Sequence, residues 1–523
     1  MFGGFLGLSH CTKRASCSQA SGGSPAFHQR QTAGKRTSIA NDLGNTLRFG
    51  EENMRNWRWF LVLVLTTCLP AGVFAQVKVE GTWRLRIEDW QWFDVPGFDT
   101  DYTYAHSLLR LALRGETGAA RWTAELAQAG LFDVPNAVAP PPAGQLGFGG
   151  TLKAVNGDNR ASLFVKQLNV EWTQAWGRLK VGRMEFAEGR EVSVKDAGLN
   201  WLHANRLSNR LIGPFGFSPI TRSFDGMLLQ IGDNTARWVA FAAYPTQGAF
   251  DLNGNPTLTN VNQLYLAYAR AQEKENTGFD WRLFWGWYRD NRRVLKVDNR
   301  PQAVRQADTE DIRVWTLGGH WVQVWNSTAG RADMLLWGAL QGGEWGSLGH
   351  SAYALSAEAG FQFPTRWKPW VRVGYYVGSG DKDSADDRHE TFVAGMNTPR
   401  LYAMTPFYNT MNLEDAFAQV LLALHPRWSA RIDYHRLRLH KASDLWYTGG
   451  GPFDNTSYGV AGRPSGGNRD LAHLFDLSLS YRASDNLQIS VYKSWVQGGS
   501  VVRSVYPAGE DGGLFFIEAN YRF

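Results

Sequence analysis

Cysteine is scarce in this sequence, and long apolar runs are absent. The 523 residues contain three cysteines, Cys11, Cys17 and Cys68, all near the amino terminus. The rest of the chain therefore has no disulfide framework and no thiolate metal site. Mean hydropathy is −0.33, and the apolar run at 60–65 is far shorter than the roughly 20 residues of a membrane-spanning helix. These features exclude a helical membrane protein.

Residues 54–75 have the pattern of a secretory signal peptide. Arg55 and Arg58 precede the apolar run, and Pro70 and small residues follow it up to Ala75, after which we expect cleavage. Residues 1–53 have no periodic apolar pattern, so we interpret them as a mis-start or a disordered leader. The sequence thus predicts three regions: 1–53, the signal peptide 54–75, and a single domain at 76–523.

Without its first 75 residues the chain has almost no net charge. The whole chain carries 54 Lys and Arg against 48 Asp and Glu; eight of the basic and three of the acidic residues lie in 1–75, which leaves 46 against 45. The basic character of the full sequence therefore comes from the leader. A domain with net charge +1 gives no support for a nucleic-acid partner.

The last residues alternate strictly between apolar and polar side chains. Phe515, Ile517 and Tyr521 fall on one face with the terminal Phe523, and Glu518 falls on the other. A strand with one lipid-facing row and one polar row is what a membrane β-barrel requires, because lipid cannot satisfy a free sheet edge. The terminal Phe also resembles the signal read by bacterial outer-membrane assembly machinery. The last strand of a soluble sandwich is the alternative for this segment alone.

The rest of the domain contains further segments of the same kind, about eighteen in all. Nine long polar connections alternate with eight short turns, which places both ends of the domain on the short-turn, periplasmic side. This regularity favours an all-β fold, a single closed antiparallel transmembrane barrel with long extracellular loops, over a sandwich. The expected strands are 77–88, 105–116, 119–131, 161–173, 178–186, 221–231, 236–244, 261–271, 279–290, 312–326, 331–340, 351–363, 367–377, 413–424, 428–439, 471–482, 487–495 and 514–523.

Within these strands the alternation repeatedly assigns basic side chains to the lumen. An arginine facing lipid at mid-depth would cost about 2–4 kcal/mol, so this assignment is energetically favoured. Two interpretations stay open. The basic groups either pair with wall carboxylates such as Glu80, Glu88, Asp433 and Glu518, or form a cationic, anion-selective constriction that binds carboxylates through the guanidinium fork. The pore-lining residues assigned by alternation are Arg84, Arg86, Arg110, Arg114, Arg222, Arg282, Lys368, Arg372 and Arg431.

One long connection, 188–219, is expected to fold into the lumen and narrow it. It has about thirty residues and contains Trp201, His203, Arg206 and Arg210. Loops of this length without secondary structure are usually functional or disordered.

The sequence offers weak signals for two other kinds of chemistry. Asp381, Asp383, Asp386 and Asp387 place four carboxylates in an extracellular loop, where they form either a Ca²⁺ site or a solvated acidic loop, the second being favoured because EF-hand spacing is missing. We expect no other cofactor. A hydrolase would need a Ser near a His, but Ser429 and His435 are six residues apart on one strand, about 20 Å, so we predict no enzyme.

Three stretches resemble the alginate-export family of outer-membrane porins. They are LKVGRMEFAEGR (179–190) followed by TRSFDGMLLQIG (221–232), then YYVGSGDKDSADDRHETF (375–392), and RDLAHLFDLSLSYRASDNLQISVYKSW (469–495). The order of these motifs carries the resemblance.

This resemblance implies an eighteen-stranded barrel in the outer membrane of a Gram-negative bacterium, diffusion or export of an anionic polyuronate such as alginate, and an electropositive selectivity zone. Arg183, Arg222 and Asp225 match family motifs and become candidate pore residues. Arg183 shares parity with outward residues, so a lumenal position requires a bulge at Gly182. The expected partners are outer-membrane lipids, the assembly machinery and an anionic solute, and the protein is expected to be a monomer. An uptake porin specific for small solutes is the alternative function.

Overall fold

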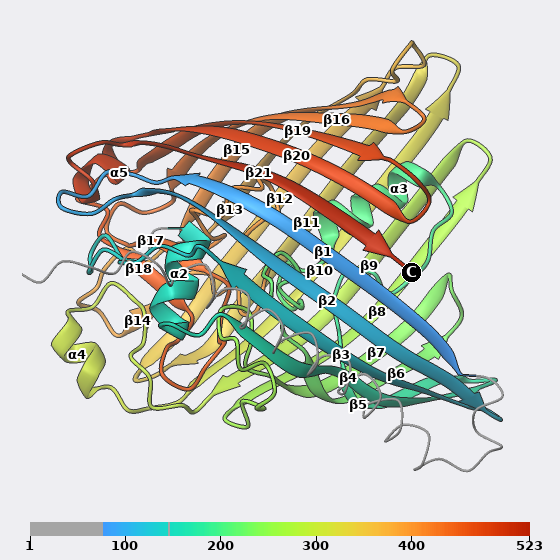
Figure 1. The fold of residues 1–523 in the computed structure, drawn as a ribbon, viewed down its shortest axis with the longest axis horizontal. Coiled ribbons are helices and arrows are strands. Elements are labelled where there is room, and N and C mark those ends of the chain that lie inside the picture. Colours follow the sequence, from blue (N-terminus) through green and yellow to red (C-terminus); the bar gives the residue numbers. More distant parts are fainter. Residues whose placement is uncertain (1–76, 145–146) are drawn as a thin grey trace, which may run out of the picture. The chain divides into compact units, whose positions relative to one another are not determined.

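The computed structural model describes residues 77–144 and 147–523, so the predicted leader and signal peptide lie outside the described residues. The described chain forms a closed antiparallel barrel of eighteen strands (Figure 1), as the alternation predicts. The barrel strands are β1 (Lys78–Gln91), β2 (Asp101–Thr117), β3 (Ala120–Phe132), β4 (Ala161–Gln174), β5 (Gly177–Met184), β6 (Phe224–Gly232), β7 (Ala236–Pro245), β8 (Val261–Lys274), β9 (Thr277–Asp290), β10 (Ile312–Ser327), β11 (Gly330–Trp345), β12 (Leu348–Gln362), β13 (Trp370–Gly378), β15 (Leu413–His425), β16 (Trp428–Leu439), β19 (Asp470–Arg482), β20 (Leu487–Gly498) and β21 (Asp511–Arg522).

The first and last strands close the barrel. They pair in antiparallel register from Thr82 opposite Arg522 to Gln91 opposite Gly513. The terminal Phe523 extends this pairing, because its backbone N–H and C=O both bond to Gly81, at 3.0 and 2.8 Å. No barrel strand is left with a free edge, which satisfies the requirement that lipid imposes on a spanning sheet.

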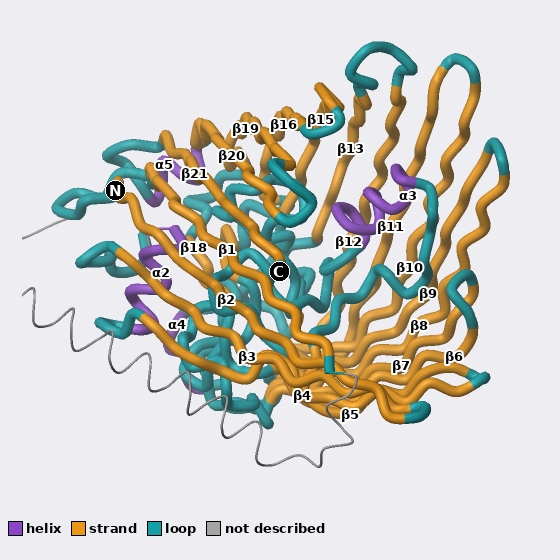
Figure 2. Tube along the Cα trace, turned by 45° about the vertical axis from the view of Figure 1, so that its right-hand side comes forward, coloured by secondary structure: helices purple, strands orange, loops and turns teal. Residues whose placement is uncertain are grey.

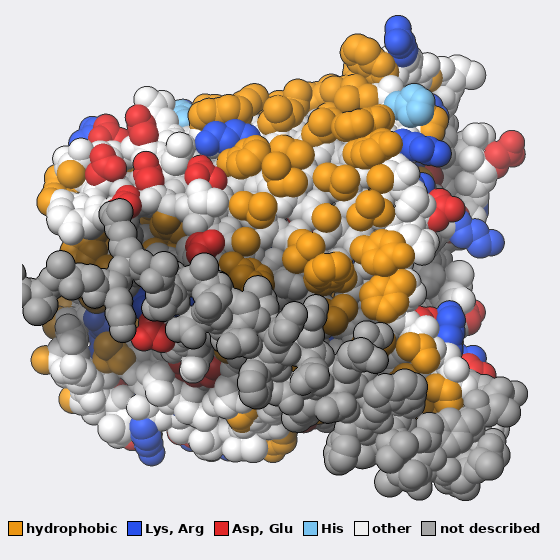
Figure 3. Space-filling view, in the orientation of Figure 1, with side chains coloured by type: hydrophobic (Ala, Val, Ile, Leu, Met, Phe, Trp, Pro, Cys, Tyr) orange, Lys and Arg blue, Asp and Glu red, His pale blue; other side chains and the backbone are white. Residues whose placement is uncertain are grey.

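The outer face of the barrel is apolar. Along β1 the outward residues Val79 and Ile87 are 59% and 54% exposed. The inward residues Arg86 and Glu88, on either side of Ile87, are buried. Figure 3 shows apolar side chains forming a broad band over the strands, with charged side chains gathered toward the two ends. The inside-out arrangement of polar and apolar residues is that of a transmembrane barrel.

Eight short connections lie at one end of the barrel, and eight long connections lie with one further short turn at the other. The long connections carry the remaining elements: α2 (Gly147–Asn156), α3 (Ala197–Leu202), the π-helix His203–Leu207, α4 (Gln302–Ala307), α5 (Ser500–Val505), the two-residue strand β14 (Arg388–His389) and the hairpin β17 (Trp446–Gly449) with β18 (Val460–Arg463). No helix in the described part of the chain is long and apolar enough to cross a membrane.

One expected long connection is not a loop. Residues 341–350 were expected to join two strands that end at 340 and begin at 351, but β11 runs to Trp345, β12 starts at Leu348, and a two-residue turn joins them. Gly346 adopts a φ of +62°, which glycine reaches at little cost. Eight connections at this end are therefore long, not nine, because these two strands extend beyond their neighbours.

Candidate functional site: the barrel lumen

The segment between β5 and β6, residues 185–223, runs down inside the barrel to the short-turn end. The Ser193 N–H donates to the Asn234 carbonyl in the β6–β7 turn at 2.8 Å, the Lys195 and Asp196 N–H groups donate to Glu273 at the end of β8, and Asp196 pairs with Arg331 at the start of β11. Figure 2 accordingly shows α3 far from the other labelled helices. The prediction that residues 188–219 enter the lumen is confirmed.

The segment turns back at this end, and a series of buried ion pairs holds both of its limbs to the wall formed by β9 to β12. His203 Nε2 lies 2.9 Å from Asp280 Oδ2 of β9, and Arg206 Nε lies 3.3 Å from Glu358 Oε2 of β12. Glu188 and Glu191 of the same segment contact Arg282 of β9 at 2.5 and 2.9 Å. These contacts fix the segment to the wall by charge as well as by packing.

Several wall arginines assigned from the sequence are buried or partly buried and already paired. Arg372 contacts Asp333 at 3.0 Å and Glu358 at 2.9 Å, and none of these three side chains is exposed. The other pairs are Arg86 with Glu88 and Glu518, Arg110 with Glu125 and Glu185, Arg282 with Glu188 and Glu191, and Arg431 with Asp433. At these heights the lumen contains the ladder of ion pairs that was one of the two interpretations.

Two further assigned residues lie at the short-turn rim. Arg114 is 48% exposed and contacts Glu80 at 2.5 Å. Lys368 was expected within a strand, but β13 begins at Trp370, and Lys368 lies in the preceding turn with a φ of +44°. It nevertheless lines a lumenal cavity. The turn is longer than expected because Trp367 and Lys368 both take left-handed backbone conformations.

Arg183 does not reach the lumen, contrary to the expectation of a bulge at Gly182. The pairing of β5 with β4 and β6 is continuous through Gly182, and Arg183 lies opposite Leu168, which is 59% exposed on the outer face. Residues directly opposite each other share a face, so Arg183 and its partner Asp225 face outward. The register shift lies instead between β3 and β4, at Glu125 and Leu126.

Arg183 and Asp225 neutralise each other's charge on the outer face of the barrel. Arg183 Nε and Nη2 donate to the two oxygens of Asp225, each at 2.7 Å, and Nη2 also donates to the Asn255 carbonyl at 2.7 Å. The Thr257 hydroxyl donates to the same carboxylate. Bidentate pairing and cover from the β7–β8 loop let these charges occupy the outer wall near the long-loop end.

Arg222, the third residue taken from the family motif, joins the inward segment 185–223 to the β16–β19 connection, residues 440–469. It is 1% exposed, and its Nη2 donates to the Gly450 carbonyl at 2.7 Å. Nε and Nη1 have no hydrogen-bond partner among the described residues. Burial lowers the pKa of this arginine to about 9, which marks a guanidinium held in poorly solvating surroundings.

Three guanidinium groups converge on Phe217, at the end of the inward segment. The Cζ atoms of Arg86 and Arg400 lie 3.6 and 3.3 Å from its ring centroid, and Arg84 donates to the carbonyls of Gly216 and Ser218 at 2.5 Å. Arg400 comes from the β13–β15 connection, residues 379–412, which also folds inward: its Tyr402 carbonyl accepts from Arg431 of β16 at 2.6 Å. This cluster of Arg84, Arg86 and Arg400 around Phe217 is the candidate constriction.

Comparison with known proteins places this architecture in a family. A sequence model described as alginate export matches residues 158–511, more than half of the chain. The chain belongs to the alginate-export family. None of the curated protein sequences matches it.

Solved structures share the fold of this family member at low sequence identity. OpdK of Pseudomonas aeruginosa with vanillate is 10% identical, with a TM-score of 0.52 over 85% of this chain and 98% of that one. Acinetobacter baumannii OccAB2 is 10% identical, with a TM-score of 0.52 over 86% of this chain and 98% of that one. OccAB3 of the same organism is 11% identical, with a TM-score of 0.51 over 86% of this chain and 100% of that one. Its family and its closed barrel together make the alginate-export protein an outer-membrane channel of a Gram-negative bacterium. Barrels of this class turn their short turns toward the periplasm.

The periplasmic mouth of the alginate-export barrel holds two cavities with mainly basic linings. The first, of about 490 Å³, is lined by Lys78, Arg114, Arg121 and Lys180 together with Glu116 and Glu171. The second, of about 400 Å³, is lined by Arg331, Lys368 and Arg431, with no acidic residue in its lining. We call these two cavities the periplasmic vestibule. Seven basic and two acidic side chains line it. Six of the basic ones form an ion pair with a carboxylate, and Lys368 forms none among the described residues.

The extracellular end has a different lining. A cavity of about 100 Å³ lies between Phe148, Phe250 and Phe453, with Arg463 as its basic group. Its walls come from five separate long connections, one of which carries β17 and β18. The extracellular end thus has a small, partly aromatic cavity, whereas the cavities with several basic residues lie at the periplasmic end.

The structure does not bring the four aspartates of the candidate Ca²⁺ loop within reach of one ion. Asp381, Asp383 and Asp386 each accept a backbone N–H two residues further along the chain, as in ordinary turns. Burial and the neighbouring Asp444 raise the pKa of Asp381 to about 7. Among the described residues, the group of His, Asp and Glu side chains whose ligand atoms lie close enough for one ion is elsewhere, in β16 and β19.

Proposed function

We propose that this channel carries an anionic polymer of the polyuronate type, such as alginate, along a path lined by basic side chains, without catalysing a reaction. The observation that carries the proposal is the periplasmic vestibule, where seven basic side chains and two acidic ones line the cavities. A polyuronate carries a carboxylate on every sugar, so it would meet a basic group repeatedly as it moves. Membership of the alginate-export family supports this substrate class.

The constriction would offer the same chemistry at closer range. Arg86 is held by Glu88 and Glu518, so an incoming carboxylate would exchange with a wall carboxylate and not meet a bare charge. Exchange keeps the Arg86 guanidinium paired throughout, and the displaced wall carboxylate keeps a neutral hydrogen-bond donor, Trp90 for Glu88 or Asn520 for Glu518. Arg84 and Arg400 have no carboxylate among their hydrogen-bond partners in the described residues and are the open members of the cluster.

The inward segments would have to move for a polymer to pass. Residues 185–223 and 379–412 both lie inside the barrel and meet at the constriction. We infer that the structure corresponds to a closed channel and that the polymer displaces these segments.

A substrate-specific uptake porin for small anions is the second candidate. The small aromatic cavity with Arg463 at the extracellular end favours it, because an aromatic wall and one guanidinium suit a compact carboxylate. A similarly folded OpdK structure contains vanillate, a small aromatic carboxylate.

Channel block separates the two functions. Purified protein in planar bilayers would be exposed to alginate oligomers, to neutral oligosaccharides of equal length and to small aromatic carboxylates. Block by alginate from the periplasmic side, with none by the neutral sugars, supports the proposal. Block only by the small carboxylates from the extracellular side would favour the uptake porin instead.

A variant set locates the block. Replacing the rim residues Arg114, Arg121 and Lys180 together by Gln should weaken alginate block by about tenfold, since exposed charge interactions contribute roughly 0.2–1 kcal/mol each. The matched control replaces Lys153, Lys382 and Arg503, which lie in long extracellular loops. Equal weakening in both variants would mean that general surface charge and not the vestibule binds the polymer.

A further inference from the structure

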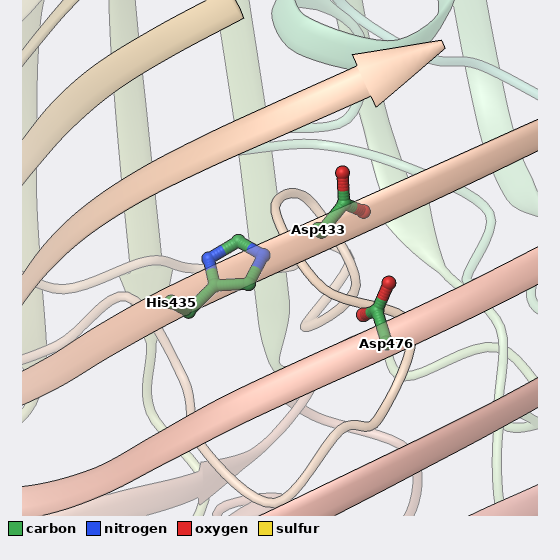
Figure 4. A group of neighbouring side chains, drawn as sticks. All are labelled: Asp433, His435 and Asp476. Atoms are coloured by element: carbon green, nitrogen blue, oxygen red, sulfur yellow. The ribbon is translucent and has the colours of Figure 1, made fainter. Parts of the chain in front are cut away.

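A cluster of ionisable side chains that plays no part in the proposed path lies on the inner wall, in β16 and β19. Asp433 and His435 are two residues apart on β16 and so share its lumenal face, and Asp476 of β19 lies directly opposite Asp433. One ligand atom from each of the three lies within 4.8 Å of the others, and all three residues are buried. Figure 4 shows the His435 ring and both carboxylates turned toward one another.

The histidine is oriented by a fourth residue. His435 Nδ1 lies 3.0 and 3.1 Å from the two oxygens of Asp415 on β15, so the carboxylate holds the proton on Nδ1. Nε2 is then left with its lone pair, and it has no hydrogen-bond partner among the residues of the described chain although the side chain is fully buried. A carboxylate that fixes the far nitrogen of a histidine is the usual outer partner of a metal-binding imidazole.

The charges around this cluster do not balance. Asp415, Asp433 and Asp476 contribute three carboxylates, and Arg431 contacts Asp433 at 2.5 Å. The next guanidinium, Arg206, bonds to the amide oxygen of Gln419 at 3.1 Å and faces Glu358. The remaining neighbours in direct contact are neutral: Gln419 and Tyr492 donate to Asp433 and Asp476 at 2.6 and 3.0 Å.

From these observations we propose that Asp433, His435 and Asp476 bind a divalent transition-metal ion, with Asp415 as the residue that orients His435. A divalent cation would supply the missing positive charge and a partner for Nε2. One imidazole nitrogen and two carboxylate oxygens suit Zn²⁺ and its first-row neighbours better than Ca²⁺ or Mg²⁺, which prefer oxygen alone. Ligands at about 2.0–2.2 Å from Zn²⁺ are at most about 4.4 Å apart, so a small side-chain rotation closes the site.

Such an ion would join β16 to β19 on the lumenal side. It would also stiffen the wall beside the inward segment 379–412, because Arg431, the neighbour of the site, donates to the Tyr402 carbonyl of that segment at 2.6 Å. The ion would thus stabilise the wall and would not lie on the proposed path of the polymer. It would lie next to a segment that the proposed polymer would displace.

Zinc binding by the whole chain tests the assignment. Protein purified in detergent, stripped with a chelator and dialysed against Zn²⁺ should retain one ion per chain by elemental analysis, and Zn²⁺ should raise its melting temperature. His435→Gln and Asp476→Asn should retain none, and Asp415→Asn should bind roughly 10–100-fold more weakly. His320→Gln is the matched control, because His320 is an equally buried lumenal histidine paired with Asp280, and it should bind like the wild type.

Two results would overturn the site: wild-type protein that binds no more Zn²⁺ than His435→Gln, or variants that keep the ion. Folding of each variant is checked by its heat-dependent migration in gels. If the variants do not fold, X-ray absorption at the zinc edge of the wild type decides. A shell of oxygen and nitrogen with a single imidazole supports the assignment, and any other shell contradicts it.

Discussion

The guanidinium of Arg86, in the first strand, stacks on the ring of Phe217, at the end of the inward segment, with its Cζ 3.6 Å from the ring centroid. Arg400 stacks on the same ring at 3.3 Å. One aromatic side chain of the inward segment 185–223 therefore contacts a guanidinium of the wall and a guanidinium of the other inward segment, 379–412.

Removing this ring should open the constriction. Phe217→Ala deletes the surface on which both guanidiniums rest, so we expect a higher single-channel conductance and stronger anion preference. Phe363→Ala is the control, since Phe363 is 42% exposed and lies near the periplasmic rim. Conductance recorded in planar bilayers measures the effect, and an unchanged value for Phe217→Ala would place the narrowest point elsewhere.

Locking the inward segment should block polymer passage. The Ser193 N–H bonds to the Asn234 carbonyl at 2.8 Å, which brings the two residues within reach of a disulfide, and no natural cysteine lies beyond Cys68. The double variant Ser193→Cys with Asn234→Cys should keep its small-ion conductance when oxidised and lose alginate passage, and reductant should restore it. Passage by the oxidised protein would show that this segment does not need to move.

Breaking a fully buried ion pair should be costly. Arg372→Ala leaves Asp333 and Glu358 without their shared partner, and we expect a loss of about 3–5 kcal/mol in stability. Arg114→Ala removes a pair at the exposed rim and should cost about 1 kcal/mol or less. Thermal unfolding in detergent compares them, and equal losses would contradict the assignment of Arg372 as buried structure.

Acid should loosen the extracellular loop that carries β14. Burial and the adjacent His350 hold the pKa of His389 well below its usual value. The His389 imidazole therefore takes up a proton near pH 6.5 in the unfolded loop but stays neutral at that pH in the folded loop. Stability from this residue is present above about pH 6.5 and falls as pH decreases, by about 2 kcal/mol at pH 5. Hydrogen exchange of residues 386–393 should accelerate between pH 7.5 and 5 after correction for intrinsic rates, and less so in His389→Asn.

The barrel itself could be predicted because its signals are local. Alternation with period two marks each strand, and turn residues mark the short connections. The β11–β12 turn was missed because Gly342 and Gly343 interrupt the alternation, and Arg183 was misplaced because a family motif was given more weight than its own strand parity.

The site could be predicted only in part, because its partners are distant in sequence. Parity identified Arg282 and Arg372, and the same parity would have found Asp280, Asp333 and Glu358, whose positions alternate with apolar residues. Arg400 had no such signal, since it lies in a long loop without periodicity. The pairing of Asp433 with Asp476 depends on strand register, which the sequence does not state.

Charge selectivity tests the central claim most directly. Reversal potentials across a salt gradient in planar bilayers would compare the wild type with a variant in which Arg114, Arg121, Lys180 and Lys368 are replaced by Gln, and with a control in which Lys153, Arg160, Lys382 and Arg503 are replaced. These vestibule residues lie at the periplasmic mouth, where screening beyond about 8 Å leaves the extracellular charges little influence. The account predicts an anion-selective wild type, a vestibule variant shifted toward cations, and an unchanged control. A cation-selective wild type, or equal shifts in both variants, would contradict it.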